Sequence, residues 1–142
     1  ADIATETLVA GLVDLGWECD DVTAYRTVRA TPPPAPVRDA IKSGKFDAVV
    51  FTSSSTVRNL VGIAGKPHPS TVIAVIGPAT AKTAEEHGLR VDVLAPRPDV
   101  DELVSALADF GASRRQSMLE AGEPVTKPSE RKPSARRKVR AK

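Results

Sequence analysis

Apolar residues recur with helical spacing over the first fifteen positions and then change rhythm. The helical pattern covers residues 2–15, and Gly16 stands where a left-handed residue would end the helix. Residues 17–28 interleave apolar and polar side chains, which predicts an extended segment. The proline-rich run 31–36 fits the interior of neither element, so we expect a stiff linker that leads into a short helix over residues 37–43.

From residue 48 onward, short apolar runs alternate with helical patterns. The runs 48–51, 72–76 and 91–94 are apolar at nearly every position, which predicts strands buried on both faces. A helical pattern follows each run, and such βαβ units build a parallel sheet with right-handed crossovers. The first helical pattern rests on Val57, Leu60 and Val61, and the second covers Gly77–His87. The third has an apolar stripe of Val100, Leu103, Val104 and Leu107. It begins after Asp99 as the N-cap, with Glu102 as the capping-box partner.

The charge balance divides the chain at Phe110. Residues 1–110 hold 10 Lys and Arg against 15 Asp and Glu, a net charge of −5, whereas residues 111–142 hold 10 against 3, a net charge of +7. The acidic body excludes a uniformly basic nucleic-acid-binding domain. The tail has three prolines and few large apolar residues, so we expect residues 111–142 to be a disordered, solvated appendage.

Several classes of protein are excluded by what the sequence lacks. No apolar run approaches the roughly 20 residues of a membrane span, so no membrane partner is expected. The lone Cys19 excludes an internal disulfide framework and a cysteine-based zinc site. Neither the Walker A motif nor the G-x-G-x-x-G motif of nucleotide-binding proteins occurs. We therefore expect a cytoplasmic protein, and because the sequence opens directly on a helical pattern, we expect its first residues to continue a longer chain.

Candidate chemistry lies where the predicted strands end, because ligands of open parallel sheets bind at the carboxyl edge. Two of these loops place small or hydroxyl residues at the start of a helix, where free backbone amides and the helix dipole attract anions. The candidate ligand-binding residues are Thr52, Ser53, Ser54 and Ser55 in one loop, and Gly77, Pro78, Ala79 and Thr80 in the other. The two loops predict a crevice that receives carboxylates or phosphates through neutral donors.

Each of these signals has a purely structural alternative. Serine and threonine are preferred helix caps, so the hydroxyl residues of either loop could serve only that purpose. His68 and His87 fit structural roles in a loop and at a helix end. Tyr25, the single tyrosine, fits packing on a half-buried strand as well as proton donation.

Four stretches, in order, resemble the uroporphyrinogen-III synthase family. They are the helix and Gly-Trp of residues 8–17, the Val-x-x-Tyr-x-Thr segment of residues 22–27, the strand and hydroxyl loop of residues 46–57, and the Ile-Gly-x-x-Thr-Ala turn within residues 72–84. The resemblance covers about residues 3–110. Members of this family are about twice as long as this part of the chain, so the resemblance implies a fragment.

The resemblance also implies an architecture of two α/β domains, flavodoxin-like in their parallel sheets, that are joined by an extended two-stranded linker. Residues 1–24 would then be the end of one domain, and residues 25–36 the linker. Residues 37–110 would be most of the other domain without its first strand, and residues 111–142 the tail.

The activity implied by the resemblance is that of a hydro-lyase of haem, sirohaem and cobalamin biosynthesis. It cyclises hydroxymethylbilane, a polycarboxylate tetrapyrrole, with loss of water and inversion of ring D. Tyr25 and Thr80 match family positions that would act in catalysis, Tyr25 by helping hydroxide to leave and Thr80 by orienting carboxylates. We expect a monomer that works without cofactor, metal or nucleic acid. The alternatives are a non-enzymatic ligand-sensing or regulatory domain with a tail that contacts nucleic acid, and a sugar-phosphate-binding module.

Overall fold

The computed structural model describes residues 6–26 and 28–130, which fall into two units, Ala1–Ala30 and Thr31–Lys142. The first unit contains helix α1, Thr7–Asp14. This helix ends as predicted: Gly16 has φ +85°, and the amide of Trp17 donates to the carbonyl of Leu12 over 3.0 Å. None of its residues is buried. The described part of residues 17–30 contains no strand, so the predicted extended segment has no sheet partner there.

The second unit carries the parallel sheet, whose strands are β1 (Ala48–Phe51), β2 (Val72–Val75) and β3 (Val93–Leu94). Their order is β1-β2-β3, with Ala48 opposite Val72 and Ala74 opposite Val93. The prediction of three parallel strands is confirmed, although the last two are shorter than expected. The helices are α2 (Ala35–Ser43), α3 (Ser54–Ala64), α4 (Pro78–Glu86) and α5 (Val100–Glu120), and a 3₁₀ turn covers Pro128–Glu130.

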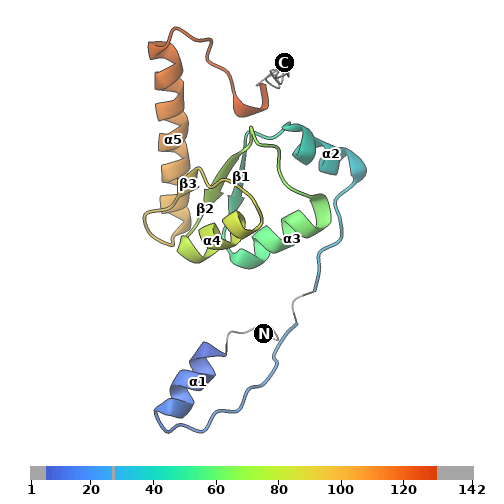
Figure 1. The fold of residues 1–142 in the computed structure, drawn as a ribbon, viewed down its shortest axis with the longest axis vertical. Helices are drawn as coiled ribbons and strands as arrows, with labels where there is room; N and C mark the ends of the chain where they lie inside the picture. The colour runs from blue at the N-terminus through green and yellow to red at the C-terminus, as the bar shows by residue number, and fades with distance from the viewer. Residues whose placement is uncertain (1–5, 27, 131–142) are drawn as a thin grey trace, which may run out of the picture. The chain divides into compact units, whose positions relative to one another are not determined.

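Helices cover both faces of this sheet (Figure 1). Helices α3 and α4 pack on one face, where alternate residues such as Phe51, Ile73 and Val75 form a buried cluster. Helix α5 packs on the other face over Val72, Ala74 and Val93, and its Leu103 is fully buried. Strands with two covered faces need apolar residues at successive positions, which explains the short continuous runs in the sequence.

Strand β1 departs from this pattern and corrects one prediction. It is an edge strand among the described residues, and its Val50 is 43% exposed. Val50 shares a sheet face with Ala48, but α5 packs over β2 and β3 rather than over Val50. The expectation that this strand is buried on both faces is therefore wrong at Val50, because apolar character shows what could be covered and not what covers it.

Helices α2 and α4 each begin with a proline in the first turn. Helix α2 begins at Ala35, two residues before the predicted start, because a proline in the first turn removes no helical hydrogen bond. It ends, as expected, at Gly44 with φ +76°. Helix α4, predicted over Gly77–His87, has Gly77 as N-cap and Pro78 as its first residue, and Gly88 follows its end with φ +72°.

Helix α5 differs from prediction in which side it buries. Asp99 caps it by accepting from the amides of Asp101 and Glu102. The Glu102 carboxylate binds Arg97 instead of completing the capping box. The buried stripe consists of Leu103 with the partly buried Ala106, Leu107 and Phe110. Val100 and Val104 were expected in that stripe, but both are exposed.

The C-terminal extension corrects the prediction of disorder. Residues 111–120 are the second half of α5, since no proline interrupts the helix before position 124, and Met118 is buried. The chain then turns back, and the Arg114 guanidinium donates to the carbonyl of Thr126 over 2.7 Å. Ser129 donates from its amide and hydroxyl to the Asp47 carboxylate over 2.9 and 2.6 Å. The disorder expected from residue 111 is wrong for this part of the chain; residues 131–142 lie outside the described residues.

Candidate functional site

The two candidate loops, Thr52–Ser55 and Gly77–Thr80, lie side by side at the carboxyl edge of the sheet. Parallel pairing of β1 with β2 ends both strands at this edge, and the amide of Ile76 still donates to the carbonyl of Phe51 over 3.0 Å there. Helix α3 begins directly after β1, and α4 directly after β2. The fold therefore brings two helix N-termini, with their positive dipole ends, to the same edge.

The N-terminus of α3 is capped by its own side chains. Ser53 accepts at its hydroxyl from the amide of Thr56 over 3.2 Å, and the Thr56 hydroxyl accepts from the amide of Ser53 over 3.3 Å. This capping box confirms the structural alternative for Ser53. The amides of Ser54 and Ser55 lie in the first turn, where a helix offers them no carbonyl partner. Thr52 and Ser55 are exposed, and the Ser55 hydroxyl lies 2.9 Å from the Ser53 hydroxyl, with which it shares a hydrogen bond.

The N-terminus of α4 is built differently. Its N-cap is Gly77, which has no side chain to accept from the first turn, and Pro78 has no amide hydrogen. The amides of Ala79 and Thr80 are the first-turn donors of this helix. The Thr80 side chain is only 4% exposed, so its accessible chemistry at this edge is that of the backbone.

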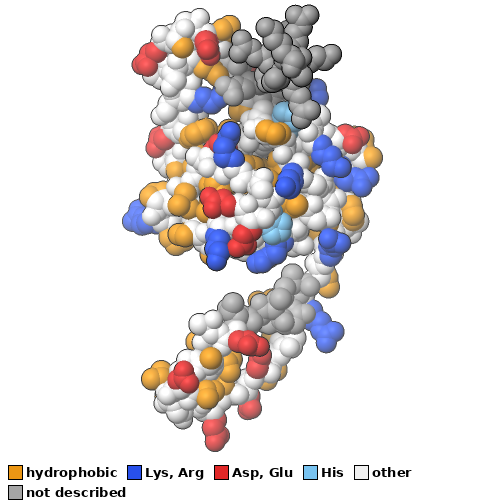
Figure 2. All heavy atoms as spheres, in the orientation of Figure 1, with side chains coloured by type: hydrophobic (Ala, Val, Ile, Leu, Met, Phe, Trp, Pro, Cys, Tyr) orange, Lys and Arg blue, Asp and Glu red, His pale blue; other side chains and the backbone are white. Residues whose placement is uncertain are grey.

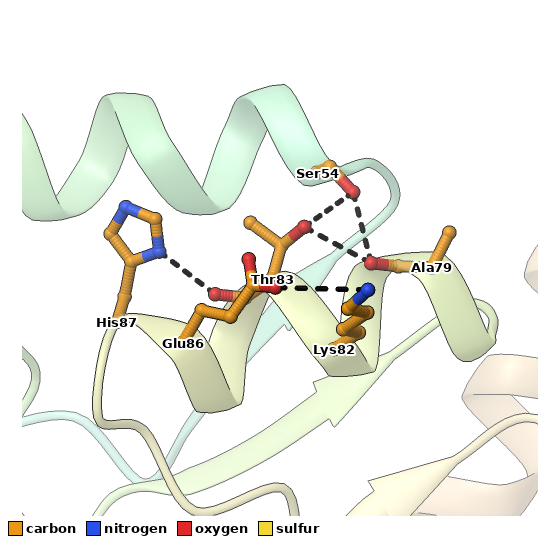
Figure 3. Close-up of polar contacts among 6 residues, drawn as sticks. All are labelled: Ser54, Ala79, Lys82, Thr83, Glu86 and His87. Atoms are coloured by element: carbon orange, nitrogen blue, oxygen red, sulfur yellow. Dashed lines mark hydrogen bonds and ion pairs between the residues drawn. The ribbon is translucent and has the colours of Figure 1, made fainter.

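A chain of three oxygens joins the two helices (Figure 3). Thr83 donates from its hydroxyl to the Ser54 hydroxyl over 2.9 Å, and Ser54 donates onward to the carbonyl of Ala79 over 3.1 Å. The Thr83 oxygen also lies 3.1 Å from the Ala79 carbonyl oxygen. Ser54 belongs to the first turn of α3 and Ala79 to the first turn of α4. This hydroxyl link therefore fixes the spacing between the two sets of free amides.

Thr83 was missed by the sequence analysis, although the sequence carries a weak signal for it. A threonine inside a helix can bond to the carbonyl four residues earlier, and Ala79 is that residue. What the sequence does not show is that the same hydroxyl meets Ser54, which lies 29 positions away.

Chemically, this edge offers neutral donors to an anion. The first-turn amides of both helices and the exposed hydroxyls of Thr52 and Ser55 can donate to carboxylate or phosphate oxygens. Lys82, on α4, is exposed and lies 4.0 Å from the Glu86 carboxylate, so its charge is partly offset. The arrangement is suited to orienting an anionic ligand, since neither loop contains a side chain that titrates near neutral pH.

The remaining sequence candidates lie elsewhere. Tyr25 belongs to the first unit and its side chain is 66% exposed, so the structure gathers Thr80 and the two loops but gives no geometry for Tyr25 against them. His87 bonds through Nδ1 to the carbonyl of Thr83 over 2.8 Å at the end of α4, which is the structural role expected for it. Within residues 6–26 and 28–130 no group of three metal-ligating side chains occurs. The same ranges contain no helix that is long and apolar enough to cross a membrane.

Comparison with known proteins gives a consistent result. A family model described as uroporphyrinogen-III synthase HemD matches residues 1–105. A putative uroporphyrinogen-III synthase of Methanothermobacter thermautotrophicus is 37% identical over 114 residues, which cover 74% of this chain and 45% of that protein. A uroporphyrinogen-III synthase of Chlorobaculum parvum is 30% identical over 104 residues, 69% of this chain and 41% of that protein. The chain thus spans less than half the length of these relatives. No solved structure matches it.

Proposed function

Because the chain belongs to the uroporphyrinogen-III synthase family, we propose that it forms the C-terminal part of an enzyme that cyclises hydroxymethylbilane to uroporphyrinogen III. The reaction removes water and inverts ring D, which makes the enzyme a hydro-lyase of tetrapyrrole biosynthesis. We place it in the cytoplasm as a monomer. The observation that carries the proposal is the pair of helix N-termini held together at one edge of the sheet by Ser54 and Thr83.

That edge suits the substrate, which carries a row of acetate and propionate carboxylates. The acidic body of the chain, with its net charge of −5, offers no general attraction to such a polyanion. Binding must therefore come from local donors, and the first-turn amides of α3 and α4 supply them. In our proposal Thr52 and Ser53–Ser55 act in one loop and Gly77–Thr80 in the other, with Ser53 and Ser54 shaping the site through the hydrogen bonds already described.

The chemistry asks for positioning more than for a strong base. The substrate loses hydroxide readily, so the enzyme has to hold the chain in the geometry for ring closure and donate a proton to the leaving oxygen. The first-turn amides of α3 and α4 would hold the carboxylates and thereby fix the two ends of the linear tetrapyrrole. We assign the proton donation to Tyr25, whose exposed phenol is free to meet substrate, and the orientation of carboxylates to Thr80.

Features of both units support a two-domain enzyme. Helix α1 buries none of its apolar residues, as expected for the end of a domain whose other elements would lie in the preceding part of the proposed enzyme. Among residues 6–26 and 28–130 strand β1 has an open edge, and its Val50 is exposed, which suits a first strand contributed from that part. The division between the units, after Ala30, lies within the proposed linker of residues 25–36. We therefore propose residues 37–110 as most of a flavodoxin-like domain with right-handed βαβ units.

The test uses the full-length parent protein and hydroxymethylbilane, with the type III and type I isomers resolved. Production of the type III isomer is expected, whereas the type I isomer alone, the product of spontaneous closure, would refute the proposal. Tyr25→Phe in the parent should slow turnover by about 100-fold if its proton is used in the reaction. Trp17→Phe, a change to another exposed aromatic of the same unit, is the matched control. An unchanged rate in Tyr25→Phe would return Tyr25 to a packing role.

A further inference from the structure

We propose that the opposite, amino edge of the sheet carries a second binding site, for a small organic anion with an apolar body. A cavity of about 350 Å³ lies there, and its lining includes Lys42, Lys66, His68, Ile73, Leu89 and Arg90. The volume lies within the range of small-molecule pockets. None of these residues belongs to the carboxyl-edge loops, so this site is separate from the proposed catalytic one.

Consecutive segments of the second unit bring the basic side chains together. Lys42 lies in the last turn of α2 and Lys66 follows the end of α3. His68 lies in the loop before β2, and Arg90 in the loop before β3. Figure 2 shows Lys and Arg side chains gathered over α2 and the end of α3 on the face in view. Parallel strands place all these segments at the same edge, so the convergence is a property of the fold.

The two lysines lie on surfaces that glycines leave open. A Cβ on Gly88 would be 2.6 Å from the Lys66 ammonium, and a Cβ on Gly65 would be 2.9 Å from Cε of Lys42. Both glycines have positive φ, which already favours glycine there. Among the described residues, no carboxylate oxygen lies within 4.0 Å of either ammonium. Arg90, by contrast, is paired with Asp92 over 2.7 Å. The lysines thus supply most of the uncompensated charge.

His68 adds a directed donor. The backbone amide of Ser70 donates to Nδ1 of His68 over 3.1 Å, and the Ser70 hydroxyl lies 2.8 Å from the same nitrogen. An Nδ1 that accepts from an amide carries no hydrogen, so the neutral ring has its hydrogen on Nε2. Gly44 permits this placement, since a Cβ there would lie 2.9 Å from Nδ1. The Nε2 hydrogen is then available to a ligand oxygen.

The rest of the lining is apolar and decides the class of ligand. Ile73, Leu89 and Pro67 are buried, and they line the cavity together with Pro69. Bare inorganic phosphate would leave these surfaces without a partner, whereas a small ring that bears carboxylate or phosphate groups would cover them and reach the cations. The shared chemistry is an anionic group on an apolar body, and the source of the anion is left to the experiment.

The experiment titrates the full-length parent with two probes, benzene-1,3-dicarboxylate and phenyl phosphate, and with neutral benzene-1,3-dicarboxamide. We expect saturable binding in the millimolar range or tighter for at least one anionic probe, and none for the diamide. The stronger probe identifies the anion as carboxylate or phosphate. In ¹⁵N-resolved spectra the shifts should centre on the amides of Ser70, Gly88 and Leu89.

Charge-removing and charge-keeping variants then test the site itself. Lys42→Gln with Lys66→Gln should weaken binding by at least about tenfold, because the short-range attraction of both ammonium groups for the anion is removed. Lys42→Arg with Lys66→Arg should retain binding. Lys82→Gln changes an exposed lysine of α4 that does not line the cavity, so it should leave binding unchanged. Equal binding in the glutamine and wild-type proteins, shifts centred on Ser54 and Ala79, or no saturable binding would each overturn the proposal. The type III isomer assay is independent of this result, so failure of one proposal does not imply failure of the other.

Discussion

In our proposals, the two edges of the sheet bind anions with different kinds of group. At the carboxyl edge the donors are backbone amides and hydroxyls, and the helices there present their positive ends. At the amino edge the same helices end, and their C-terminal carbonyls make the backbone negative. Lys42 and Lys66 supply positive charge where the backbone cannot, and His68 adds a neutral donor. The comparison shows that the direction of the helices determines which edge needs cationic side chains.

The same comparison supplies the competing explanation for the lysines. Lys42 occupies the last turn of α2, where a cation is favourable because it interacts with the helix dipole. A lysine that serves only this purpose would not bind a dissolved anion measurably. The titration described above separates the two roles, and the following variants test how far the edges depend on each other.

The largest effect on stability is expected from the hydrophobic core under the sheet, which supports both edges. Leu103 is fully buried under the sheet, so Leu103→Ala should lower the free energy of unfolding by about 2–5 kcal/mol. Val104→Ala, one position on and 59% exposed, is the matched control and should change it by less than about 0.5 kcal/mol. Urea unfolding of the full-length parent measures both. Similar losses for the two variants would contradict the assignment of the buried side of α5.

A smaller effect, confined to the carboxyl edge, is expected from Thr83. Thr83→Val keeps the shape but removes the donor to Ser54, which should cost about 1–2 kcal/mol and let α3 and α4 shift against each other. We expect a raised KM for hydroxymethylbilane with little change in probe binding at the amino edge. Thr83→Ser restores the hydroxyl and should restore the KM. An unchanged KM in Thr83→Val would show that the link has no role in substrate binding.

The elements of the sheet could be predicted because their signals are local. The strand Ala48–Phe51 was predicted with its observed bounds, since an apolar run and its flanking polar residues are adjacent in sequence. The Asp99 cap was predicted for the same reason, and Ser53 was one of the hydroxyl residues for which capping was the structural alternative. Each depends on a few neighbouring residues and on the known preferences of helix ends.

The features that could not be predicted join residues that are far apart. Thr83 meets Ser54 across 29 positions, and Ser129 meets Asp47 across 82. The exposure of Val50 depends on where α5 packs, and the length of α5 depends on contacts such as the burial of Met118. Composition alone predicted disorder after Phe110, because it does not reveal that a helix already begun on the sheet can continue beyond it.

The cap of α3 offers a finer test of the carboxyl edge. Ser53→Ala removes the acceptor for the Thr56 amide and should cost about 1 kcal/mol in the free energy of unfolding. Ser55→Ala removes only an exposed hydroxyl that bonds to the Ser53 hydroxyl, so it should cost less than Ser53→Ala but weaken substrate binding if that hydroxyl contacts a carboxylate. Thermal unfolding and KM together distinguish the two positions. Equal destabilisation by both changes would contradict the division between cap and ligand donor.

The smallest effect belongs to the amino edge, where the C-terminal extension reaches Asp47. Hydrogen bonds from the Ser129 hydroxyl and then from its amide lower the pKa of the Asp47 carboxyl. Burial opposes them, and the charges of Lys127 and Arg114 add smaller lowering effects. Because the pKa is lowered in the folded state, the attachment is at full strength above the ordinary carboxyl pKa of about 3.9 and is lost as the pH falls through the lowered value.

The amide resonance of Ser129 should therefore stay constant from neutral pH down to about pH 4 and move only below it. Asp47→Asn should abolish that movement, because the amide keeps no acceptor that titrates, whereas Asp109→Asn on the exposed side of α5 should not affect it. A transition that persists in Asp47→Asn would mean that another group holds the extension. If the attachment is instead as described, the extension can be released by acid without disturbing the cavity cations, since Asp47 does not line that cavity.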